Sequence, residues 1–134
     1  MQNNPLSHAR RICLWLVALL GLSLLTGCDE VKITNLTPGS LPENPSQIYT
    51  LTARFSPKAS GIVAGSLRPS VVIDGKIHPM KASPLGQDIY EFDYQIPAGR
   101  TELAYYYLVN FKVEYSGTVS EREAYIGLQN ARIV

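Results

Sequence analysis

One histidine and a short run of carboxylates are the side chains in this sequence that could support catalysis. His78 and His8 are the only histidines, and a Ser-His-Asp site would need His78 as its general base. Asp88, Glu91 and Asp93 are carboxylates of the kind that act in pairs in glycoside cleavage. On a strand, Glu91 and Asp93 would share one face, which is typical of a solvated surface. We therefore expect no enzymatic activity, no metal site and no cofactor.

Three consecutive tyrosines, Tyr105–Tyr107, are the most unusual local feature. Successive side chains of a strand point to opposite faces, so Tyr105 and Tyr107 would pack inward and Tyr106 outward. An outward ring beside aliphatic residues can stack on a sugar or contact a partner protein. It can also be covered by another part of the chain, which is the interpretation we favour. Tyr106 and the nearby Asn110 are the candidate ligand-binding residues.

Cys28 is a candidate for modification, because it follows a segment typical of an export signal. Arg10 and Arg11 precede an apolar run, Ile12–Leu25, that is interrupted only by a glycine and a serine. As a helix this run would extend about 21 Å, whereas a transmembrane helix needs roughly 20 apolar residues. The run is therefore too short for a good membrane span and suits the apolar region of a signal peptide.

The residues directly before Cys28 sharpen this interpretation. Leu25–Cys28 has the sequence Leu-Thr-Gly-Cys and resembles the lipobox of bacterial lipoproteins. The resemblance implies that residues 1–27 are cleaved as a signal peptide, that the Cys28 sulfur is diacylated, and that the new amino group is acylated. Such a protein is held at the cell membrane or the outer membrane by its lipid anchor. An ordinary signal with a chance cysteine, or an uncleaved anchor, is the alternative.

Removing residues 1–27 changes what the composition allows. Without Arg10 and Arg11 the formal net charge falls from +1 to about −1, which argues against a nucleic-acid partner because such binding needs a basic surface. Cys13 also leaves, so Cys28 becomes the sole cysteine and an intrachain disulfide is impossible. The mature domain must therefore be stabilised by its hydrophobic core.

Residues 31–134 alternate apolar and polar side chains in short runs, which predicts β-strands. The expected strands are 31–36, 47–55, 71–73, 77–80, 88–96, 101–115 and 118–126, with a short edge at 131–134. Asp74-Gly75 and Ser116-Gly117 predict hairpin turns, because these residues tolerate positive φ. In the longest run the odd-numbered residues from Leu103 to Tyr115 should face the core. About seven strands favour an immunoglobulin-like antiparallel β-sandwich that follows a lipid-anchored N-terminus, residues 28–30.

Two family resemblances imply the same fold. Ile33–Pro38 followed by Tyr49–Thr52 resembles the start of an IPT/TIG-type immunoglobulin-like domain. Asp88–Phe92, the turn Pro97–Gly99 and the aromatic strand Tyr105–Val109 resemble the early-set domains found beside carbohydrate-active enzymes. Carbohydrate-binding relatives usually present tryptophan on the binding face, whereas the only tryptophan of this chain lies in the predicted signal peptide.

These observations predict a non-catalytic, lipid-anchored protein of the bacterial cell envelope. Residues 31–134 would form its immunoglobulin-like interaction or structural domain. The alternative is a carbohydrate-binding module of the envelope, in which Tyr106 and Asn110 would contact the sugar. The expected partners are the membrane, through acyl chains on Cys28, and an envelope protein or a glycan.

Overall fold

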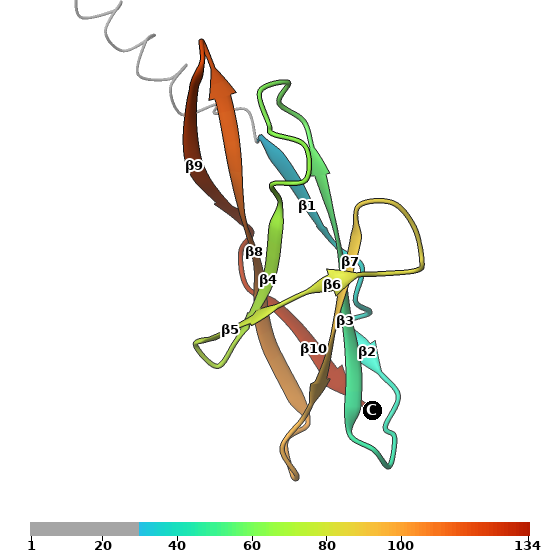
Figure 1. Ribbon diagram of the computed structural model, residues 1–134. Helices are drawn as coiled ribbons and strands as arrows, with labels where there is room; N and C mark the ends of the chain where they lie inside the picture. The colour runs from blue at the N-terminus through green and yellow to red at the C-terminus, as the bar shows by residue number, and fades with distance from the viewer. Residues whose placement is uncertain (1–29) are drawn as a thin grey trace, which may run out of the picture.

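Residues 30–134, which are the residues that the computed structural model describes, form two β-sheets packed face to face (Figure 1). The predicted signal peptide, residues 1–27, and the predicted lipid site at Cys28 lie outside the described residues. The strands are β1 (Val31–Asn35), β2 (Ser40–Leu41), β3 (Ile48–Pro57), β4 (Arg68–Ile73), β5 (Lys76–Pro79), β6 (Lys81–Ala82), β7 (Ile89–Gln95), β8 (Glu102–Tyr115), β9 (Thr118–Tyr125) and β10 (Gln129–Ile133). None of the described segments is a helix of the length and apolarity that crossing a bilayer requires.

The order of the strands is that of an immunoglobulin-type sandwich. One sheet has four strands in the order β1-β3-β7-β6, and the other has six, in the order β2-β10-β8-β4-β5 with β9 also paired to β8. The first order matches strands A-B-E-D of that fold, and β10-β8-β4 matches G-F-C. The prediction of an all-β sandwich is confirmed, and so are both hairpin turns. Asp74-Gly75 and Ser116-Gly117 have positive φ at both residues.

The structure departs from the expected strand pattern in two respects. Residues 30–134 contain ten strands rather than about seven, and among the extra ones β2 and β6 have only two residues each. An alternating pattern cannot be recognised over two residues. The pairing of β2 with β10 is parallel, whereas all other strand pairs are antiparallel.

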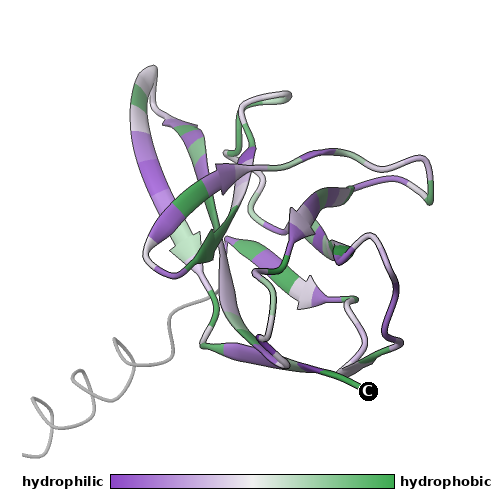
Figure 2. Ribbon diagram, turned by 90° about the horizontal axis from the view of Figure 1, so that it is seen from below, coloured by the Kyte–Doolittle hydropathy of each residue, from purple (hydrophilic) through white to green (hydrophobic). Residues whose placement is uncertain are grey.

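The core lies between the two sheets and follows the alternation of the sequence, which Figure 2 shows along the strands. The largest fully buried side chains come from β3, β4 and β8: Leu51, Phe55, Val71, Ile73, Leu103, Tyr105, Tyr107, Val109 and Val113. The inward prediction for β8 is therefore confirmed up to Val113. It is wrong for Tyr115, whose side chain is 48% exposed. Tyr115 adjoins the hairpin turn, and its ring lies against Gly61 instead of the core.

A group of hydrogen-bonded polar side chains borders this core, where the chain passes from β1 to β2. The Tyr107 hydroxyl oxygen lies 2.9 Å from Asn35 Oδ1 and 3.0 Å from Thr37 Oγ1. Asn35 Nδ2 donates to the Tyr105 hydroxyl at 3.1 Å, and the Thr52 N–H donates to Thr37 Oγ1 at 2.9 Å. β1 ends at Asn35, so it offers no backbone carbonyl to the Thr52 N–H of β3. The Thr37 hydroxyl accepts this hydrogen bond instead. Tyr105 and Tyr107 can be buried because their hydroxyls have these partners.

Replacing Tyr107 by Phe should therefore destabilise the domain. The change removes one hydroxyl and leaves buried polar atoms of Asn35 and Thr37 with one partner fewer, which costs about 1–3 kcal/mol. Urea unfolding of the variant should give a lower midpoint with an unchanged slope. Tyr125→Phe is the matched control, because the Tyr125 side chain is 72% exposed. Equal midpoints for the two variants would contradict the role of the buried hydroxyl.

The stability of the domain should also fall at alkaline pH through the same tyrosine. Burial raises the pKa of Tyr107 well above its usual range, and this effect exceeds the opposing effect of the hydrogen bond to Thr37. Above about pH 10 the unfolded chain releases a proton that the folded chain retains, so unfolding becomes more favourable as the pH rises. The stability difference between wild type and Tyr107→Phe should narrow by about 1.4 kcal/mol from about pH 9 to about pH 11. Urea unfolding at both pH values tests this, and a constant difference would contradict it.

Candidate functional site

The outer face of the six-stranded sheet carries the residues that the sequence singles out. Tyr106 pairs with Val72, and Val72 pairs with Ile77, so these three residues lie side by side on β8, β4 and β5. Tyr106 lies on the outward face as predicted, yet it is only partly exposed. Val72 is buried although it is on the outer face, whereas Ile77 is 63% exposed. Part of this face is therefore covered by its own side chains.

The apolar surface continues along β8 to β9. Leu108 pairs with Tyr125 and is buried, while Tyr125 is among the most exposed large hydrophobic residues of the domain. We call the following five residues the outer patch: Val72, Ile77, Tyr106, Leu108 and Tyr125. It has a buried centre flanked by two exposed side chains, one on β5 and one on β9. The buried centre agrees with the interpretation that this face is covered by other parts of the chain. The exposed side chains of Ile77 and Tyr125 remain available to contact a ligand or a partner.

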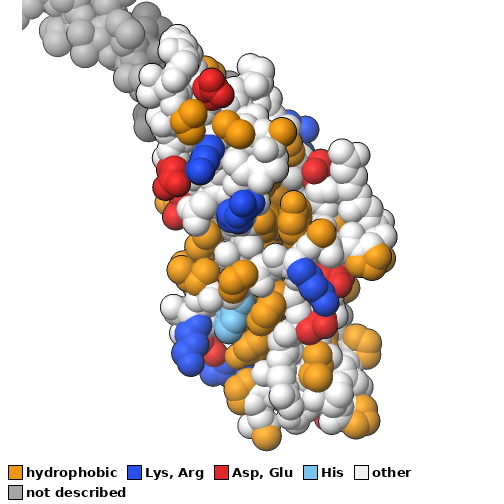
Figure 3. Space-filling view, viewed as in Figure 1, with side chains coloured by type: hydrophobic (Ala, Val, Ile, Leu, Met, Phe, Trp, Pro, Cys, Tyr) orange, Lys and Arg blue, Asp and Glu red, His pale blue; other side chains and the backbone are white. Residues whose placement is uncertain are grey.

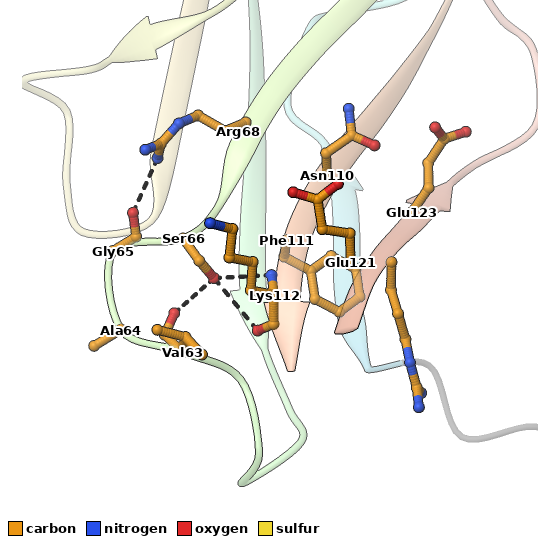
Figure 4. Close-up of a pocket in the computed structure, with 11 residues that line it drawn as sticks. Val63, Ala64, Gly65, Ser66, Arg68, Asn110, Phe111, Lys112, Glu121 and Glu123 are labelled. Carbon is orange, nitrogen blue, oxygen red and sulfur yellow. Dashed lines mark hydrogen bonds between the residues drawn. The ribbon is translucent and has the colours of Figure 1, made fainter. Parts of the chain in front are cut away.

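Asn110 borders the outer patch and opens into a polar cleft (Figure 4). The cleft has a volume of about 780 Å³ and lies between the β3–β4 loop and the β8–β9 pair. Asn110 faces Arg68 on β4 and Glu123 on β9 in the strand register. Arg68 donates to the carbonyl of Gly65 at 2.9 Å, which fixes the guanidinium beside the loop.

The β3–β4 loop, which closes the cleft, is hydrogen-bonded to the backbone of β8 at Lys112. Ser66 Oγ donates to the Val63 carbonyl at 2.7 Å and accepts from the Lys112 N–H at 3.1 Å. The Val63 N–H donates in turn to the Lys112 carbonyl at 2.8 Å. Figure 4 shows Glu121 and Glu123 on the β9 side of the same cleft. The arrangement offers carboxylate, amide, ammonium and guanidinium groups, which can hydrogen-bond to the hydroxyls of a sugar or the polar groups of a peptide.

His78 belongs to β5, and its ring lies against β7. Its ring stacks on Phe92, with 4.8 Å between the centroids and an interplanar angle of 25°, and lies 6.0 Å from the ring of Tyr94. The space-filling view shows the histidine surrounded by hydrophobic side chains (Figure 3). His78 is therefore partly buried among aromatic rings.

The carboxylates that the sequence singles out lie on the other sheet. Glu91 accepts a hydrogen bond from Ser83 Oγ at 3.0 Å, and Asp93 accepts one from Thr50 Oγ1 at 2.6 Å. The carbonyl of Asp88 accepts the Phe55 N–H at 2.8 Å. Among residues 30–134, no group of three or more histidines, cysteines or acidic residues could hold a metal ion.

Sequence reasoning missed most residues of this face, among them Arg68, Glu121, Glu123 and Tyr125. A signal for three of them was present, because alternation along 118–126 puts Glu121, Glu123 and Tyr125 on one face. What the sequence lacks is the pairing that places them beside Asn110 and Leu108. No protein-family model, curated protein or solved structure matches the chain, so the site is defined by the residues of this chain alone.

Proposed function

We propose that the chain is a non-catalytic, lipid-anchored protein of the bacterial cell envelope, and that its immunoglobulin-like domain binds a partner protein through the outer patch. The observation that carries the proposal is the sequence order at the N-terminus. The lipobox-like Leu25–Cys28 stands directly before β1, which begins at Val31. Each buried methylene of an acyl chain contributes about 0.8 kcal/mol, so two or three chains anchor a protein stably.

The composition of the outer patch and its border supports a protein as the partner. Protein interfaces typically have an apolar, often aromatic centre and a polar rim. Ile77 and Tyr125 supply exposed apolar side chains, and the rim contains two cations and two carboxylates, on Arg68, Lys112, Glu121 and Glu123. The partner would present an apolar centre with charges of both signs around it. Tethering to one membrane raises the effective concentration of such a partner.

Replacing Cys28 by Ser should abolish lipidation. The sulfur is the group that would carry the diacylglyceryl chains, so the variant should lose palmitate label and accumulate as an uncut precursor. Metabolic labelling with palmitate followed by gel electrophoresis measures both effects. Cys13→Ser is the matched control, because this change removes the other cysteine of the chain and should leave the labelled band intact. An unchanged labelled band in Cys28→Ser would refute the anchor.

A photo-crosslinking amino acid in place of Tyr125 should yield a discrete protein adduct in intact cells, because Tyr125 is an exposed residue of the outer patch. The same amino acid in place of Arg54, an exposed residue of β3 in the other sheet, is the control and should yield no adduct of that mass. Immunoblots of irradiated cells measure both. Identical adducts from the two positions, or none from Tyr125, would count against the outer patch.

A carbohydrate-binding module is the second candidate, and the position of Asn110 favours it. Asn110 opens into a cleft lined by Arg68 and by two carboxylates, and Tyr106 lies four residues away on the same face of β8. Binding to a glycan array that is lost in Tyr106→Ala and in Asn110→Ala would favour the glycan over the protein partner. Absence of binding to any glycan of a broad array would count against the carbohydrate-binding function.

A further inference from the structure

We infer that the end of the sandwich nearest the predicted anchor rests on the bilayer, with the β8–β9 turn at the level of the lipid headgroups. This inference rests on the proposed lipid anchor. It adds which surface of the domain meets the lipid and how the domain is oriented. We call this surface the anchor end and define it as Glu30, Lys58–Ile62 and Tyr115–Val119.

The tether between the lipid site and the domain is very short. Asp29 is the only residue between Cys28 and Glu30. One residue of extended chain spans at most about 3.6 Å, so the Cα atoms of Cys28 and Glu30 lie within about 7 Å of each other. Acyl chains on Cys28 would therefore begin within one or two residue lengths of the domain surface.

Glu30 contacts the rest of the anchor end through its backbone and contacts β9 through its side chain. Its carbonyl accepts the N–H of Lys58 at 2.7 Å and that of Ala59 at 3.2 Å. Its carboxylate forms an ion pair with Arg122 of β9. These contacts tie the first described residue to two other segments, so Glu30 is part of the folded domain.

The same end presents uncharged and partly apolar side chains. Tyr115–Val119 and Ala59–Ile62 contain no charged residue, and Val119 is 54% exposed. The Tyr115 ring lies against Gly61, where a Cβ would come within 2.6 Å of it, and the Arg122 guanidinium lies 5.9 Å from the ring centroid. Figure 1 shows the β8–β9 turn, the β3–β4 loop and the start of β1 at one end of the sandwich.

A bilayer surface fits this composition. Tyrosine is enriched at the membrane interface, because its ring is apolar and its hydroxyl can stay in water. Lys58 is exposed beside the loop, where its ammonium group can reach the phosphates of the headgroups. With the turn at the bilayer, β8 points away from it, and Leu108 in the outer patch stands seven strand residues from Tyr115, or about 23 Å.

Tryptophan fluorescence in vesicles tests this orientation. The only tryptophan of the chain is Trp15, so a Trp15→Phe background makes any introduced tryptophan the sole reporter. Tyr115→Trp places the reporter at the anchor end, and Tyr125→Trp is the matched control on the outer patch. The full chain is expressed in bacteria, purified from membranes in detergent, and reconstituted into phosphatidylcholine vesicles whose acyl chains carry bromine.

We expect several-fold stronger bromine quenching and a blue-shifted emission in Tyr115→Trp relative to Tyr125→Trp. Val119→Trp should behave like Tyr115→Trp, and it keeps the Tyr115 ring in place. Equal quenching at positions 115 and 125 would overturn the orientation, and so would the absence of quenching at both. Intact mass of the same samples separates the two proposals. An acylated chain that begins at Cys28 with equal quenching overturns only the orientation, whereas a chain without acyl groups overturns the lipid anchor and the orientation with it.

Discussion

The sandwich depends on how the chain satisfies its polar groups where it crosses from one sheet to the other between β1 and β2. β1 pairs with β3, and β2 pairs with β10, so the segment between them joins the two sheets. Asn35, Thr37 and the Tyr107 hydroxyl provide the hydrogen bonds that the interrupted ladder would lack. Residues 30–134 contain no cysteine. This crossing and the apolar core therefore hold the two sheets together without a disulfide bond.

β8 contributes residues to the hydrogen-bonded crossing and also to the outer patch, the cleft and the anchor end. Its inward residues, among them Tyr105 and Tyr107, form the core and bind the crossing. Its outward residues Tyr106 and Leu108 belong to the outer patch, Asn110 opens into the cleft, and its last residue lies at the anchor end. Core packing therefore fixes the relative positions of the patch, the cleft and the anchor end, since each of the three includes residues of β8.

Alternation of apolar and polar residues was sufficient to predict most of the fold, because it reports which side of a strand is buried. It located β3 and β8, and the two hairpin turns followed from residues that tolerate positive φ. It could not locate β2 or β6, whose two residues carry no pattern. The partners of the tyrosine hydroxyls escaped prediction because Asn35 and Thr37 are 70 or more residues away along the chain. The cleft escaped for the same reason, since Arg68, Asn110 and Glu123 meet only through strand pairing.

The position of β1 also determines how the domain responds to mechanical load. The first described residue leads directly into β1, whose five residues all pair with β3. A pull on the N-terminal end directed along this strand acts across hydrogen bonds that run perpendicular to it. The bonds are then stressed together in shear instead of breaking one after another as in a zipper. The β1–β3 pairing thus resists a pull along β1 with all of its hydrogen bonds at once.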